Sequence, residues 1–197
     1  MKKKFLTLLS VLTLTALIGC NSIQQEIRSA YNFINCEYSY KSVSELTVSG
    51  INLSNGLSVT SIPKITSILS GTATSIPVNF TLNLNVKNPN ESAALLHGLQ
   101  YILSIDDVQF TTGSISQTLN IASGQTQTLP LTIGVDLAAL MKNSSKDAIT
   151  DIAKNFIGMG SKKSTVSLQL KPTFMIGNVP VSSPVYIPVS FSFGGNR

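Results

Sequence analysis

The residues best suited to chemistry in this sequence are one histidine, two cysteines and one adjacent pair of aspartates. A serine nucleophile would have only His97 as its base, and no Gly-x-Ser-x-Gly turn is present. A calcium site needs six or more oxygen ligands, and no further acidic residues cluster near Asp106 and Asp107. His97 therefore fits a surface loop, and the aspartates fit a hairpin turn. We expect no catalytic residue and no metal site.

Cys20 stands apart because of the segment that precedes it. Lys2-Lys3-Lys4 is followed by an apolar run over residues 5–18. This run is shorter than the ~20 apolar residues that cross a ~30 Å hydrocarbon core, and its basic flank is typical of a secretory signal peptide. It ends in Leu17-Ile18-Gly19-Cys20, which resembles the lipobox of bacterial lipoproteins.

The lipobox resemblance implies that residues 1–19 are a signal peptide that is removed, and that Cys20 carries a diacylglycerol and an N-acyl chain. Two or more acyl chains give stable attachment to a membrane. These covalent lipids are the only bound groups expected, with no other cofactor. Asn21 replaces the Asp that holds some lipoproteins at the inner membrane, which implies the outer membrane, facing the periplasm. An ordinary signal peptide with a chance cysteine is the alternative.

Composition excludes several classes of protein. After removal of residues 1–19, eleven basic and nine acidic residues remain, and Lys162-Lys163 is the only adjacent basic pair. We therefore expect no nucleic-acid partner, and no small-molecule substrate is indicated. With Cys20 lipidated, Cys36 has no partner for an intramolecular disulfide. Its place in an alternating run favours a buried core residue, and a reactive thiol is the alternative.

The periodicity of apolar residues changes near residue 36. Ile23, Ile27 and Tyr31 recur at helical spacing, so residues 20–35 are expected to form a short helix or a flexible tether. Residues 36–197 are expected to form one all-β domain of antiparallel strands, because apolar and polar residues alternate. Residues 36–76 should contribute two or more strands. The later alternating runs are Phe80–Val86, Leu99–Ile105, Leu129–Val135, Val166–Leu170 and Val185–Phe193.

One helical insertion is expected near residues 137–157, where Leu137, Leu140, Ile149 and Ile152 follow helical spacing. Ser144 with Asp147 resembles a capping box, so two short helices should meet near residue 143. The apolar side of these helices is expected to cover one end of the sandwich. A helix that lies on a membrane surface is the alternative.

The stretch over about 80–193 resembles the group-2 late embryogenesis abundant domain, also called the water-stress and hypersensitive-response (WHy) domain. The residues that carry this resemblance are Asn88-Pro89-Asn90 after an alternating strand, Gly98 and Tyr101 at the start of the next strand, and Gly113 at the end of a hairpin. The resemblance implies a β-sandwich of the immunoglobulin or fibronectin-III type, a link to desiccation and other stresses, and no catalytic residues.

Two functions remain open at this stage. The first is a noncatalytic envelope lipoprotein whose sandwich binds or scaffolds another envelope protein, for example through an edge strand. The second is a stress-protective domain that acts at the membrane surface. An enzyme is the least favoured possibility.

Overall fold

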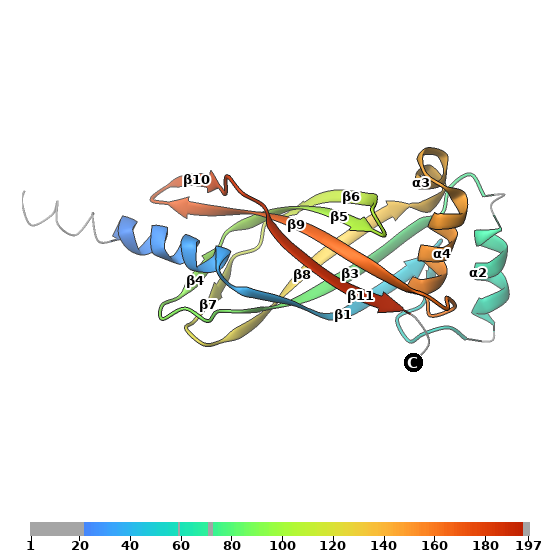
Figure 1. Cartoon of the computed structure of the whole chain (residues 1–197), viewed down its shortest axis with the longest axis horizontal. Coiled ribbons are helices and arrows are strands. Elements are labelled where there is room, and N and C mark those ends of the chain that lie inside the picture. Colours follow the sequence, from blue (N-terminus) through green and yellow to red (C-terminus); the bar gives the residue numbers. More distant parts are fainter. Residues whose placement is uncertain (1–21, 59, 71–72, 195–197) are drawn as a thin grey trace, which may run out of the picture.

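Antiparallel strands make up most of the protein in the computed structural model, which describes residues 22–58, 60–70 and 73–194 (Figure 1). The all-β, antiparallel prediction is confirmed. The predicted signal peptide and Cys20 lie outside the described residues.

The first sheet has four strands in the order β2-β1-β3-β8. Its central strand β3 buries Val78, Phe80, Leu82, Leu84 and Val86, so the predicted alternation is confirmed and one face of the sheet is apolar. The strands are β1 (Glu37–Val48), β2 (Ile51–Asn52), β3 (Pro77–Lys87) and β8 (Thr126–Asp136).

The second sheet has five strands, in the order β10-β9-β5-β6 with β11 also paired to β9. They are β5 (Gly98–Ile105), β6 (Val108–Ile115), β9 (Lys163–Ile176), β10 (Val179–Ser182) and β11 (Ile187–Gly194). A short ladder joins β4 (Ala94–Leu96) to β7 (Leu119–Ile121). The apolar faces of the two large sheets supply one common core.

The prolines of the last segments explain how β9 has three neighbours. Pro180 and Pro188 lie in β10 and β11, which are edge strands. Pro172 lies inside β9, which pairs on both sides. The β11 pairing stops at Leu170 and the β10 pairing starts at Thr173. Pro172 occupies the interval between them, where its missing N–H removes no ladder bond on that side.

Three helices cover one end of the sheets, and a fourth lies at the opposite end (Figure 1). The covering helices are α2 (Ser61–Leu69), α3 (Leu137–Asn143) and α4 (Lys146–Phe156). The fourth is the N-terminal helix, which covers 22–34 of the described residues. The predicted helical insertion is confirmed. Its apolar side packs on the core, with Ile149 and Ile152 buried.

Capping residues set where α3 and α4 begin. Asp136 caps α3, because its carboxylate accepts hydrogen bonds from the amides of Ala138 and Ile76, both at 2.9 Å. The Ser75 hydroxyl, at 2.7 Å, is the largest of several hydrogen bonds that lower the pKa of Asp136. Ser145 caps α4 through the amide of Ala148. The predicted cap at Ser144 is wrong by one residue, since Ser144 ends α3.

The segment before β3 differs from the prediction. Residues 36–76 contribute β1 and β2, but they also contain the helix α2. This helix has β-branched Ile62 and Ile65 and a proline at position 63, all of which suggested extended chain. Pro63 lies in the first turn, where no intrahelical N–H bond is lost. Ile65 and Leu69 are buried against the core, so tertiary packing decides the conformation.

Candidate functional site

The Asn-Pro-Asn motif forms a buried hydrogen-bonded turn after β3. Asn88 is fully buried, and its Nδ2 donates to the carbonyls of Ser92 and Ile121, both at 2.9 Å. Its Oδ1 accepts from the amide of Asn90 at 3.0 Å and from Asn90 Nδ2 at 2.8 Å. The Asn88 N–H donates to the carbonyl of Gln125. The side chain and backbone of Asn88 therefore join the turn over residues 88–92 to the segment over residues 121–125.

The same turn fixes the N-terminal helix. Asn90 Nδ2 donates to the carbonyl of Asn32 at 3.0 Å. The Asn32 side chain donates in return to the Ser92 hydroxyl at 2.8 Å and to the Ala93 carbonyl at 3.1 Å. Phe33, on the same side of the helix, is fully buried. The helix that follows Cys20 in sequence is thus attached to the body of the protein.

Exposed apolar residues gather at the end of the molecule where this helix lies. Ile23, Ile27 and Tyr31 form a stripe on the N-terminal helix, with Tyr31 65% exposed. The β9–β10 hairpin lies at the same end (Figure 1), and its Gly177 amide donates to Glu26 Oε2 of the helix at 2.5 Å. We call the following set the apolar end surface: Ile23, Ile27, Tyr31, Val179, Val181, Val185 and Tyr186.

No helix in the described part of the chain has both the length and the apolar character needed to cross a bilayer.

Tyr101 and Gly113 form a pair that links the two sheets. They lie opposite each other on β5 and β6, and the Tyr101 ring occupies the space that a Cβ at position 113 would fill. The Tyr101 hydroxyl reaches the other sheet and donates to the carbonyl of Thr132 on β8 at 2.8 Å. Burial raises the pKa of this hydroxyl. The prediction that Gly113 ends a hairpin is wrong, because β6 continues to Ile115.

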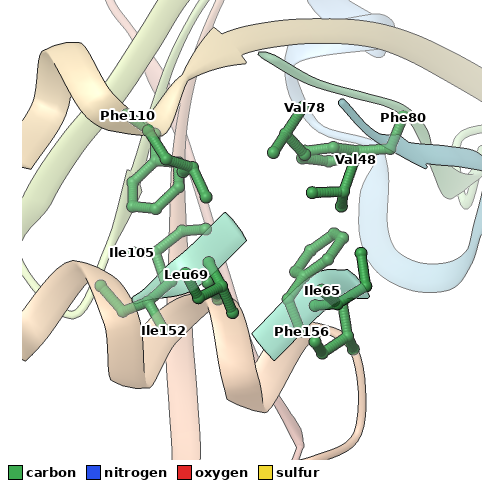
Figure 2. Close-up of a pocket in the computed structure, with 12 residues that line it drawn as sticks. Val48, Ile65, Leu69, Val78, Phe80, Ile105, Phe110, Ile152 and Phe156 are labelled. Carbon is green, nitrogen blue, oxygen red and sulfur yellow. The ribbon is translucent and has the colours of Figure 1, made fainter. Parts of the chain in front are cut away.

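A cavity between the two sheets was not predicted from the sequence. It has a volume of about 260 Å³ and lies between β1 and β11, with Tyr40 and Val43 on one side and Phe191 and Phe193 on the other. A smaller apolar space of about 30 Å³ adjoins it beneath α2 and α4, and both are lined by Phe80, Ile105 and Phe156. Figure 2 shows the side chains around the smaller space, including Leu69 and Phe110.

The family assignment rests on sequence. The family model of the late embryogenesis abundant proteins matches residues 83–185, which is just over half of the chain. The chain belongs to the late embryogenesis abundant family. The match to this family begins within β3 and includes the Asn88 turn and the Tyr101–Gly113 pair. It ends before β11, so the three residues that line the cavity from β11, which are Phe191, Phe193 and Gly194, lie outside it.

Three solved structures resemble this chain over most of its length. A protein from Arabidopsis thaliana is 12% identical, covers 80% of this chain and 80% of its own, and has a TM-score of 0.45. A protein from Archaeoglobus fulgidus is 13% identical, covers 81% and 99%, and has a TM-score of 0.37. A solution structure described as a late embryogenesis abundant protein is 14% identical, covers 94% and 86%, and has a TM-score of 0.35. A search of curated proteins found no match.

Cys36 is buried, as predicted. Burial, with a smaller contribution from the charge of Glu37, raises its pKa to about 11. Its Sγ lies 3.4 Å from the Asn32 carbonyl. The Tyr38 hydroxyl beside it donates to the carbonyl of Phe33 at 2.6 Å, and burial raises the pKa of Tyr38 as well. A thiol with such a pKa is a weak nucleophile at neutral pH.

The remaining candidate side chains are not brought together. His97 lies between β4 and β5, half-buried, with the Met175 amide 3.3 Å from its Nδ1. Asp106 and Asp107 form the β5–β6 turn with positive φ values of 47° and 65°, which confirms the predicted hairpin turn. Asp106 Oδ1 accepts from the Thr165 amide at 2.7 Å. Among the described residues, no three His, Cys, Asp or Glu side chains are grouped so as to hold a metal ion.

Proposed function

We propose that this protein is a lipid-anchored, noncatalytic domain of the late embryogenesis abundant family that acts at a membrane surface in stress protection. The proposal includes the removal of residues 1–19, the acylation of Cys20, and an immunoglobulin- or fibronectin-III-like arrangement of the two sheets. It also includes the WHy subgroup and an outer-membrane location facing the periplasm. The family assignment supports the protective role.

The apolar end surface is the observation that carries the membrane part of the proposal. Apolar residues exposed together on a soluble protein mark a contact with a partner or a membrane. Here the contact lies on the N-terminal helix and on the β9–β10 hairpin, which is bonded to that helix through Glu26. Acyl chains on Cys20 would enter the bilayer next to this surface. Stable membrane anchoring usually combines two membrane-binding features. Here the acyl chains would be the first feature and the apolar end surface the second.

The anchor is tested by replacing the acylated sulfur. We expect the variant Cys20→Ser to remain unprocessed or unacylated and to leave the membrane fraction, and mass spectrometry of the wild type to show a diacylglycerol on Cys20. The matched control is Cys36→Ser, which removes the other cysteine and should leave processing and retention unchanged. An unacylated mature wild type, or a retained Cys20→Ser protein, would refute the anchor. Protease treatment of whole cells then tests the periplasmic orientation.

The binding or scaffolding function remains a second candidate because of two strand edges. Among the described strands, β1 over residues 37–46 pairs only with β3, and β11 pairs only with β9. Such edges offer backbone groups to an added strand of a partner protein. Crosslinking in membranes followed by purification distinguishes the two functions. One stoichiometric partner would support the scaffold, whereas many substoichiometric neighbours would support the protective domain.

A further inference from the structure

The cavity between β1 and β11 is open along a seam between the two sheets. β1 and β11 belong to different sheets and are not paired. The Tyr40 and Phe191 rings stack across the seam with their centroids 4.9 Å apart. Beneath them the cavity of about 260 Å³ is lined on both sides by apolar side chains. Since a water molecule needs only ~10–15 Å³, the space is large enough for a small organic ligand.

The cavity at the seam has a second apolar space beside it. Phe80, Ile105 and Phe156 line both the cavity and the smaller space under α2 and α4. In that inner part every lining side chain is apolar, and the labelled side chains in Figure 2 surround a common gap. Protein cores normally contain few voids larger than a water molecule. A dry apolar space binds apolar ligands rather than water, and this one suits a narrow chain.

One end of the cavity is polar, and a surface depression with two lysines adjoins it. At that end of the cavity, Asn155, Gly158 and Gly194 line the wall. Gly194 pairs with Lys163, and a Cβ at position 194 would lie 3.4 Å from the carbonyl of Lys162. Lys154 and Lys162 line a surface depression that shares Asn155 with the cavity, and Asp151 is its only acidic residue. This end therefore favours a negatively charged group.

We propose that the cavity binds one free fatty acid, with the acyl chain between the two sheets and the carboxylate near Lys154 and Lys162, which line the depression next to Asn155. The apolar lining recognises the methylene chain, and the lysines distinguish an acid from its ester. A two-chain phospholipid does not fit a single narrow space of this volume. The proposal does not depend on acylation of Cys20.

The test is photo-crosslinking of the full chain, in isolated membranes, with a palmitate analogue that carries a diazirine on its chain. We expect mass spectrometry to find the label on the β1 segment around residues 40–43 and the β11 segment around residues 191–194. Unlabelled palmitate should compete with the probe and suppress the labelling. It should do so at no more than a tenth of the methyl palmitate concentration that gives the same suppression. Lys154→Glu with Lys162→Glu should remove this preference for the acid.

Two matched variants test whether the cavity is the site. Val43→Trp places an indole in the seam and should reduce labelling by about tenfold, the loss expected for about two methylene groups left unburied. Val179→Trp makes the same change on the exposed β10 and should leave labelling unchanged. Phe191→Ala is a second variant that enlarges the opening, and it should move the label toward the inner residues without loss of folding by circular dichroism.

Three results would overturn the proposal. The first is a label spread over the surface and insensitive to palmitate. The second is equal labelling of Val43→Trp and Val179→Trp. The third is equal competition by palmitate and methyl palmitate, which would show that the site does not recognise the carboxylate.

Discussion

At the scale of single residues, we expect the removal of the Asn88 side chain to destabilise the fold most for the size of the group removed. Asn88→Ala removes the partners of two carbonyls and of the Asn90 amide inside the protein. A buried group without its hydrogen bond costs roughly 1–3 kcal/mol. We therefore expect the free energy of unfolding to fall by about 3 kcal/mol, measured by urea titration. Asn85→Ala, on the same strand, is the control and should change it by no more than about 0.5 kcal/mol.

The chemistry of Cys36 gives a second residue-scale prediction. Its pKa rises from 9.0 to about 11, so its thiolate fraction near pH 8 is about a hundredfold below that of an ordinary cysteine. Alkylation by iodoacetamide in the Cys20→Ser background should be at least that much slower than in urea. The rate should rise with pH up to about 11. Fast labelling at pH 8 that Cys36→Ala abolishes would contradict this prediction.

The raised pKa also fixes the sign of one pH effect on stability. Because the folded protein holds the Cys36 proton more tightly than the unfolded chain, the favourable contribution is complete below pH 9.0. It is lost as pH rises from 9.0 toward about 11.

At the scale of elements, the Tyr101–Gly113 pair should determine how firmly β5 and β6 are tied to β8. Gly113→Ala places a methyl group in the Tyr101 ring and displaces the hydroxyl that bonds to Thr132. Overpacking of this kind costs roughly 1–3 kcal/mol. Ser114→Ala on the same strand is the control. In a double-mutant cycle with Tyr101→Ala, the added cost of Gly113→Ala should largely disappear; a cost that stays the same would show that the ring is not the cause.

The strands could be predicted from the sequence better than the contacts between them. The alternation of Phe80, Leu82 and Leu84 indicates that one face of β3 is buried and the other faces solvent, which is a local property of the strand. The helix α2 could not be recognised, because its β-branched residues and Pro63 favour extended chain and only burial of Ile65 overrides them. The seam between β1 and β11 could not be predicted from the sequence either. Phe191 and Phe193 alternate as core residues do, yet both remain half-buried because β11 has no neighbour on that side.

The candidate site was predictable in part for the same reason. Asn88-Pro89-Asn90 identifies a turn by its residue types. The bond from Asn90 to Asn32, 58 residues away, depends on tertiary structure and leaves no local signal. Cys36 was predicted to be buried because its run alternates, whereas its hydrogen bond to the Asn32 carbonyl was not.

At the scale of the whole molecule, the proposed function places the two ends of the protein in different surroundings. The apolar end surface lies at the end of the N-terminal helix, and the helices α2, α3 and α4 lie at the other end (Figure 1). A lipid on Cys20 would hold the first end at the bilayer and leave the second in water. The orientation is therefore a consequence of the fold that can be measured separately from acylation.

The chain contains no tryptophan, so a single introduced indole reports its own position. We expect Ile27→Trp, 53% exposed in the wild type, to show blue-shifted emission and strong quenching by brominated phospholipids when the protein is reconstituted in vesicles. Ile62→Trp on α2, 39% exposed, is the matched control and should emit as in water. The expected difference follows because an apolar side chain at an interface gains free energy by entering the acyl region. Equal quenching of the two variants would mean that the apolar end surface does not face the bilayer, and it would then be free to contact a protein.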